Sequence, residues 1–281
     1  MITSLAKKTF PRFFSQPAAL CGVGLFLLLT VVLGAGPLIS PYAYDELHLA
    51  SKNLPPCATF WLGTDQLGRD LFVRLCYGAR LSFAIAAATA FIDLFLGLMI
   101  GSLAGFASKG FEEGLMRLLD IFYSIPTLLG AILLSLVFGS GFLSIVIAVN
   151  LTGWITMARV VRSEISLLKE LPFITAAQAL GAKKLYLFFR HLLPNLWSSI
   201  FVTLTMTIPA AIFSEAFLSF LGLGIQAPLA SWGTMAYEGL PALQYFPWRL
   251  LFPAACISLT MLSFYLMGRA LSHEASAYRR L

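Results

Sequence analysis

Six stretches of about 20 mainly apolar residues constrain this 281-residue chain more than any other feature. A helix needs about 20 such residues to cross the hydrocarbon core of a bilayer. The predicted spans are 18–40, 81–107, 118–138, 142–158, 196–220 and 250–271. Because 59% of the residues are hydrophobic and only 11% are charged, a water-soluble domain would lack a polar surface. We therefore expect an all-α, polytopic membrane protein with six transmembrane helices.

The first apolar run has two interpretations. Lys7, Lys8 and Arg12 precede it, as basic residues precede the core of a secretory signal peptide. The run is about 22 residues long, however, which exceeds the 7–15 residues of a typical signal-peptide core. We therefore expect an uncleaved membrane anchor.

The distribution of the 19 Lys and Arg residues predicts the orientation. Fourteen lie in the N-terminal segment, in the gap after the second span, in the gap 159–195 or at the C-terminal end. The alternate side holds five: Lys52, Arg69, Arg74, Arg80 and Arg249. Because basic loops stay in the cytoplasm, both termini and the loop 159–195 are predicted to be cytoplasmic.

This orientation divides the chain into five parts. They are a cytoplasmic N-terminal segment at 1–17, an anchor at 18–40, an external loop with an interfacial helix at 41–80, a five-span core at 81–272 and a cytoplasmic tail at 273–281.

The cytoplasmic loop carries a short helical pattern. Pro172 suits a first helical turn, and Gly181 can end the helix in a left-handed conformation. One apolar face is made by Phe173, Ala176, Ala177 and Leu180. Such a face fits an interfacial helix on lipid and a docking helix for a cytoplasmic partner equally well. The pattern by itself leaves both interpretations open.

The spacing in this loop resembles that of the EAA loop of ABC importer permeases. That pattern is Glu-Ala-Ala, three residues, Gly, nine residues, Ile, any residue and Leu-Pro. Here Thr175 replaces the Glu and His191 replaces the Ile, and the His is similar to the peptide and nickel branch. In that family the loop forms a coupling helix that seats in a groove of the ATPase. The resemblance implies ATPase coupling by Phe173, Thr175, Ala176, Ala177, Leu180, Gly181, Leu193 and Pro194.

Two further segments resemble the same branch. Residues 62–70 are similar to the Gly-Thr-Asp-x-x-Gly-Arg-Asp motif of C-type peptide permeases, and 214–224 with 231–233 are similar to a second motif, EAxLSFLGLG followed by SWG. The C-terminal tail departs from the family pattern, because the chain has Gly268-Arg269 where Gly-Asp is common. The chain is identified as resembling a C-type permease subunit of the oligopeptide, dipeptide and nickel family of ABC importers.

The first of these motifs also has a physical interpretation. A helix capped by Thr64 or Asp65 would place Leu67, Leu71 and Leu75 in one apolar stripe. This predicts an amphipathic helix at the outer interface, used for packing or for substrate contact. The motif residues assigned to this interface are Gly63, Thr64, Asp65, Gly68, Arg69 and Asp70.

Small and acidic residues mark positions inside the spans. Gly97, Gly101 and Gly105 line one helix face, which allows close packing of a second helix within the bundle. Asp93 and Glu215 lie in apolar surroundings, where an acid is costly. We predict that they line the translocation pathway or a gate; the alternative for Asp93 is a hydrogen-bonded structural role.

The sequence carries no motif for chemistry of its own. It lacks a P-loop motif and a GxSxG elbow, and His48, His191 and His273 are too scattered for a metal site. We expect no catalytic residue, cofactor or metal, and no nucleic-acid partner. The resemblance implies a homologous second permease, two cytoplasmic ATPases that hydrolyse ATP, an external substrate-binding protein, and a location in the cell inner membrane among lipid.

The predicted function is therefore half of the translocation pathway of an ATP-driven peptide importer. An ion-coupled secondary transporter would show internal repeats, and none is seen. An intramembrane enzyme would need a convergent site in the spans. A structural or assembly factor is a third alternative, and loss of uptake in a deletion strain would distinguish a transporter from it. Nickel or another small solute shares this scaffold, so the sequence leaves the cargo open.

Overall fold

A computed structural model describes residues 13–139, 141–226 and 228–278. Within these ranges the regular secondary structure is helical, and the only extended pairing is a bridge between Thr64 and Asp70. Most of the predicted N-terminal segment, with Lys7, Lys8 and Arg12, lies outside the described residues, as do Arg279 and Arg280 of the tail. The all-α prediction is confirmed.

Five described helices are long and apolar enough to cross a membrane. They are α2 (Pro17–Ile39), α3 (Leu71–Phe106), α6 (Phe142–Lys169), α9 (Leu193–Phe220) and α11 (Trp248–Tyr278). They correspond to the first, second, fourth, fifth and sixth predicted spans. The helix α3 begins about ten residues before the predicted start, and α6 ends about ten residues after the predicted end.

The third predicted span, 118–138, is not one continuous helix. The structure divides this region into α4 (Lys109–Tyr123) and α5 (Thr127–Phe138), which are bent by 74°. The break falls at Ser124–Pro126, where Pro126 lacks a backbone donor and disfavours helical geometry in the residue before it. A sixth span exists only if this bent pair is counted as one.

The interfacial helix predicted to be capped by Thr64 or Asp65 begins later than predicted. Gly63 and Gly68 have positive φ angles of 81° and 77°, and the chain between them forms a turn. The helix begins only at Leu71 and is the start of α3 itself, with Asp70 rather than Thr64 or Asp65 as its cap. Leu71 and Leu75 are buried in the protein core instead of facing lipid.

The glycine face of α3 packs against α6. A side-chain carbon added at Gly101 would lie 2.5 Å from the Ala158 carbonyl oxygen and 2.8 Å from Val161 Cβ. Gly97 meets Met157 and Gly105 meets Ile165 in the same way. The predicted use of these glycines inside the bundle is therefore confirmed.

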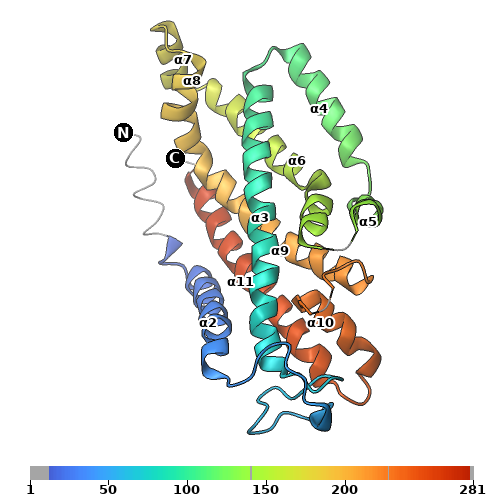
Figure 1. The fold of residues 1–281 in the computed structure, drawn as a ribbon. Coiled ribbons are helices and arrows are strands. Elements are labelled where there is room, and N and C mark those ends of the chain that lie inside the picture. Colours follow the sequence, from blue (N-terminus) through green and yellow to red (C-terminus); the bar gives the residue numbers. More distant parts are fainter. Residues whose placement is uncertain (1–12, 140, 227, 279–281) are drawn as a thin grey trace.

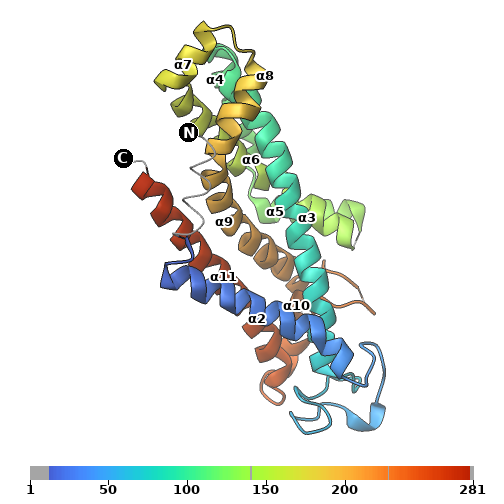
Figure 2. The ribbon, with the colours of Figure 1, turned by 90° about the vertical axis from the view of Figure 1, so that its left-hand side faces the viewer.

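The short helices lie at opposite ends of this bundle (Figure 1). One end holds α7 (Pro172–Ala179) and α8 (Lys184–Leu187), and is called the α7 end. The other holds α10 (Trp232–Gly239) and the loop before α3, and is called the α10 end. Turned by 90°, the molecule shows α3 running between the two ends while α2 lies against α11 (Figure 2).

The α3–α6 contact gives a direct test. We expect Gly101→Ala to lower the free energy of unfolding by about 1–3 kcal/mol, because the new methyl group overpacks the seam. Gly24→Ala in α2 is the matched control, since nothing lies within 4 Å of a Cβ there. Thermal unfolding in detergent compares the two, and equal midpoints would contradict the packing account.

Candidate functional site

The helix α7 buries one side chain in the bundle and exposes most of the others. Ile174 is buried in a cluster with Ile165, Leu192 and Leu196. Phe173 and Ala176 are exposed, Ala177 is half-buried, and Leu180 is 89% exposed. The predicted apolar face therefore points largely away from the chain and is available to a partner.

The end of α7 is held by a glycine turn. Gly181 has a φ of 84°, as predicted, and its N–H donates to the Gln178 carbonyl at 2.9 Å. The N–H of Ala182 donates to the Ala177 carbonyl at 3.0 Å, which completes a Schellman cap. Thr175, in the family's Glu position, turns its hydroxyl back to donate to the Pro172 carbonyl at 2.9 Å.

Behind this turn, the chain enters α9 without a break in helical structure. A π-helical turn, Phe188–Leu192, joins α8 to α9, and Pro194 lies in the first turn of α9. The ring of His191 lies 6.2 Å from the ring of Phe173 and 5.8 Å from that of Tyr186. The π-helical turn therefore connects α7, α8 and a long helix in one packed unit.

Two lysines connect the same region to the C-terminal end of α3. Lys169 Nζ donates to the Gly105 carbonyl, and Lys184 Nζ donates to the Phe106 carbonyl at 3.2 Å. These carbonyls end a helix and carry the negative pole of its dipole, which cations stabilise. The α7 end thus contacts both α3 and α9.

At the α10 end, Asp65 is the centre of a buried charge cluster. Its Oδ1 accepts from the backbone N–H groups of Leu67 and Arg69 at 2.8 and 3.0 Å. Its Oδ2 accepts from Arg69 Nε and Arg74 Nη1, both at 2.6 Å. The motif turn therefore places one carboxylate between two guanidinium groups.

A second acid and a third arginine extend the cluster to α10 and α11. Glu238 of α10 accepts from Arg74 Nη1 at 2.9 Å and from Arg69 Nη2 at 3.5 Å. Arg249 of α11 donates to Asn53 Oδ1 at 3.1 Å, to Gln66 Oε1, and to the Glu238 carbonyl at 2.9 Å. The cluster joins the loop before α3 to both elements.

Burial and hydrogen bonding shift the two motif acids in opposite directions. Burial raises the pKa of Asp65, but Arg74, Arg69 and the backbone N–H groups outweigh it, so the pKa lies below its ordinary value. Burial also raises the pKa of Asp70, and there the Phe72 N–H and the Ser40 hydroxyl offset it only in part. Asp65 therefore stabilises the fold as an anion.

Glu215 holds α10 to the bundle from inside the apolar region. Its Oε1 accepts from the hydroxyls of Ser219 at 2.8 Å and Ser231 at 2.5 Å, and its Oε2 accepts from Ser82 at 3.3 Å. These serines come from α9, the start of α10, and α3. Ser231 also caps α10 by accepting from the Thr234 N–H. One carboxyl group therefore joins three elements.

Neither acid predicted to line a pathway faces open space in this conformation. Glu215 and Asp93 are both about 1% exposed. Asp93 lies against Gly153 of α6, and within the described ranges neither of its carboxyl oxygens finds a hydrogen-bond partner. Their role as pathway or gate residues stays a prediction.

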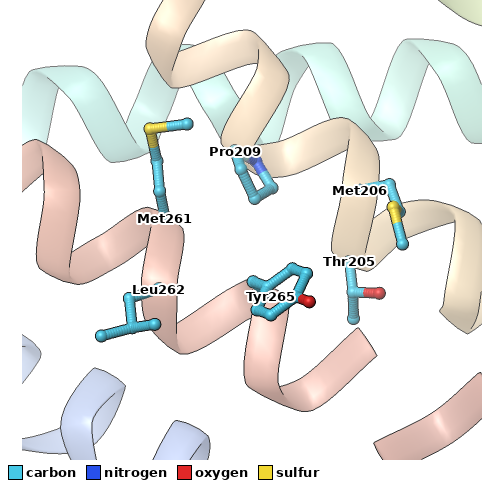
Figure 3. A pocket seen from close by; sticks show the side chains of 6 residues that line it. All are labelled: Thr205, Met206, Pro209, Met261, Leu262 and Tyr265. Carbon is cyan, nitrogen blue, oxygen red and sulfur yellow. The ribbon is translucent and has the colours of Figure 1, made fainter. Parts of the chain in front are cut away.

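An apolar groove of about 340 Å³ opens between α9 and α11. The groove follows the side of α9 at Pro209, a proline inside that helix. Figure 3 shows the side chains that line it: Thr205, Met206, Pro209, Met261, Leu262 and Tyr265. The hydroxyl groups of Thr205 and Tyr265 are the polar groups of this lining, and the other contacts are apolar. Such a lining suits lipid or a neighbouring helix more than a polar ligand.

Sequence reasoning missed the partners of the predicted residues. Arg74, Glu238 and Arg249 complete the Asp65 cluster, yet Arg74 and Glu238 are 164 residues apart in the chain. Ser82, which reaches Glu215, is an ordinary serine in an apolar helix. Two features of the sequence could have indicated these partners. Arg74 and Arg249 are two of the five basic residues on the predicted external side, and Glu238 lies five residues after the SWG motif.

Family models match most of the chain. Residues 97–276 match the binding-protein-dependent transport system inner membrane component, and residues 4–56 match the N-terminal TM domain of oligopeptide transport permease C. A solved chain of the MetNI methionine ABC transporter, in inward-facing conformations, aligns with a TM-score of 0.56 at 19% identity. It covers 70% of this chain and 95% of that one, and supports the fold alone.

Curated relatives are similar over nearly the whole length. The oligopeptide permease OppC of Bacillus subtilis (strain 168) is 47% identical, covering 95% of this chain and 88% of that protein. The dipeptide permease DppC of the same organism is 43% identical, covering 95% and 84%. OppC of Escherichia coli (strain K12) is 36% identical, covering 92% and 87%.

The Glu215 contacts predict a difference between two substitutions. Glu215→Ala leaves three buried hydroxyls without their acceptor, and should lower the free energy of unfolding by about 1–3 kcal/mol. Glu215→Gln keeps an acceptor oxygen and should cost less. Thermal unfolding measures both, and an equal loss for the two variants would show that acceptance of these hydrogen bonds is not what matters.

The Asp65 cluster predicts a dependence on pH. Because the pKa of Asp65 is lowered from 3.8, its stabilisation is complete above pH 3.8 and is lost as the pH falls through the lower, folded-state pKa. The wild type should therefore unfold at a higher temperature than Asp65→Asn at pH 6, and this difference in unfolding temperature should become smaller below pH 3.8. Asp45→Asn, at an exposed acid of the same loop, is the control. A gap that stays constant with pH would contradict the assignment.

Proposed function

Because the chain belongs to the binding-protein-dependent transport system inner membrane components, we propose that it is a permease subunit of an ATP-driven peptide importer. In this proposal it forms half of the translocation pathway, a homologous permease forms the other half, two cytoplasmic ATPases supply the energy, and an external binding protein delivers the cargo. The subunit itself provides geometry and performs no chemical step.

One observation carries the proposal most strongly. Peptide permeases of one branch are 47% and 43% identical over 95% of the chain. The exposed, rigidly capped helix α7 supports the same function, since a docking helix needs an apolar face that the chain does not cover itself. Phe173, Ala176 and Leu180 offer that face.

We place the α7 end in the cytoplasm and the α10 end outside. The basic residues support this orientation: Arg159, Arg162, Lys169, Lys183, Lys184 and Arg190 gather near α7. The location is then the cell inner membrane, with multiple spans and with both termini on the cytoplasmic side.

Coupling follows from how α7 is attached. ATP binding would draw the ATPases together and move α7, which is packed through Ile174 and His191 against the start of α9. Lys169 and Lys184 would carry the same displacement to α3. Both helices reach the α10 end, where Ser82 and Glu215 hold α10. A differential affinity of the ATPases for two arrangements would shift the population between them.

The cargo is proposed to be a dipeptide or oligopeptide. Nickel or another small solute is the alternative within the same scaffold, because selectivity resides largely in the binding protein. An ion-coupled transporter is the alternative with a different energy source.

Reconstitution separates these functions. The chain, its second permease, both ATPases and the binding protein are placed in vesicles, and uptake of a labelled dipeptide, a labelled pentapeptide and nickel is followed. We expect peptide uptake that requires ATP and the binding protein. Uptake driven by an ion gradient without ATP, or uptake of nickel alone, would contradict the proposal.

Gly181 gives a test of coupling. Because Gly181 has a positive φ, Gly181→Val strains the cap, whereas Gly181→Asn is tolerated in that conformation. No atom lies within 4 Å of an added Cβ, so the effect comes from the backbone and not from a clash. We expect the Val variant to insert normally but to lose most ATPase co-purification and uptake, and the Asn variant to retain both. Equal behaviour of the two variants would count against a docking role for α7.

A further inference from the structure

The two acids of the charge cluster are held very differently. Asp65 is bonded at 2.6 Å to both Arg69 and Arg74, and its side chain is 1% exposed. Glu238 has one contact of 2.9 Å and two of 3.4 and 3.5 Å, and its side chain is 26% exposed. Asp65 is thus a fixed part of the fold, while Glu238 sits at the open edge of the same cluster.

The guanidinium groups do not depend on Glu238 for their position. Arg69 is fixed by Asp65 through Nε, and Arg74 through Nη1. The Nε of Arg74 is buried without a hydrogen-bond partner among the described residues. If Glu238 moved away, both groups would stay in place and present donors to any carboxylate that reached them.

The charges around this edge favour an incoming acid. Arg69, Arg74 and Arg249 face two carboxylates, Asp65 and Glu238, so the cluster carries one surplus positive charge. Arg249 is held by neutral oxygen atoms of Asn53, Gln66 and the Glu238 backbone. The Asp70 carboxyl is engaged elsewhere, with the Phe72 N–H and the Ser40 hydroxyl.

We propose that Arg69 and Arg74 form a carboxylate-docking site on the outer face, that Glu238 is its built-in occupant, and that an acidic side chain of the external binding protein displaces Glu238 on docking. This inference rests on the proposed function, which places the α10 end outside and supplies a binding protein. Exchange of one carboxylate for another keeps both guanidinium groups paired, so it avoids the cost of leaving a buried charge alone.

The exchange also explains why the occupant is on α10. Glu238 lies near the C-terminal end of a helix whose other end is held by Glu215 through Ser231. Displacing Glu238 would release one of these two attachments and leave the other. Docking at the site would therefore loosen α10 at the moment when cargo is delivered.

An internal occupant lowers the apparent affinity of the site, because a partner binds only the fraction of molecules in which the site is open. Glu238→Gln removes the competing charge. We expect it to tighten binding of the peptide-loaded binding protein from the same transport system by about fivefold or more, as a coupling of ordinary size. The measurement uses the assembled transporter in nanodiscs, at low and at high salt. The gain should shrink as salt screens the charges.

Asp45→Asn is the matched control, because it removes one exposed acid from the same face outside the cluster. Glu238→Asp gives a second variant whose shorter side chain should weaken the internal pairing and give an intermediate gain, should the Gln variant fail to assemble. An unchanged or weaker affinity in the assembled Glu238 variants, or an equal gain for Asp45→Asn, would overturn the proposal.

Two further outcomes are distinguished. If a free dipeptide, without binding protein, binds the Glu238→Gln transporter more tightly than the wild type while the binding protein does not, the carboxylate comes from cargo and the proposed partner is wrong. If the wild-type transporter takes up no peptide with ATP, the proposed function fails instead, and this can be seen before any variant is compared.

Discussion

The close contact of α3 with α6 is the interaction on which the other features depend. Lipid offers no hydrophobic force between helices, so association in a membrane relies on close packing and on interhelical hydrogen bonds. Gly97, Gly101 and Gly105 allow the two backbones to approach, and α3 then runs as one helix between both ends of the molecule. Its first residues hold the Asp65 cluster, Ser82 reaches Glu215, and its last carbonyls receive two lysines from the α7 end. A bend in α3 would separate these contacts from one another.

The polar contacts within this chain differ in burial and in the groups that they pair from the α7 end to the α10 end. At the α7 end, α4 is tied to α6 by Arg159 with Asp120 and by Arg162 with Glu112, which are exposed or half-buried pairs of small individual value. Where α9 and α3 meet the start of α10, Glu215 is buried among apolar residues and accepts hydrogen bonds from hydroxyl groups. At the α10 end, buried carboxylates face arginines. This order follows the cost of placing charge in hydrocarbon. Hydrogen bonds from hydroxyl groups satisfy a buried carboxyl group without a second charge, and ion pairs are placed where the surroundings are more polar.

Much of the fold could be predicted from the sequence, and the reasons for success and failure are physical. Apolar length predicted six spans, of which five are continuous helices. The positions of Pro172, Gly181 and Pro194 predicted the course of the loop 159–195, because proline fits the first turn of a helix and glycine can end one with a positive φ. The break at Pro126 was missed because the apolar run continues across it. The helix predicted to be capped by Thr64 or Asp65 was placed too early, because Leu71 and Leu75 belong to the buried start of α3 and a further glycine turn, at Gly68, precedes that helix. The contacts of Glu238 with Arg69 and Arg74, and of Ser82 with Glu215, could not be predicted, since they join elements distant in sequence.

The central claim is that α7 transmits work from a cytoplasmic ATPase to α3 and α9. Site-specific cross-linking tests it most directly: Leu180→Cys, at a position 89% exposed at the end of α7, is introduced into a chain whose own cysteines are replaced, and the assembled transporter is treated with a short bifunctional reagent. The account predicts a cross-link to the ATPase subunit whose yield changes when ATP is added, and no labelling of the introduced thiol by an impermeant reagent from outside the cell. Labelling from outside, or a cross-link only to lipid-facing or external partners, would contradict it.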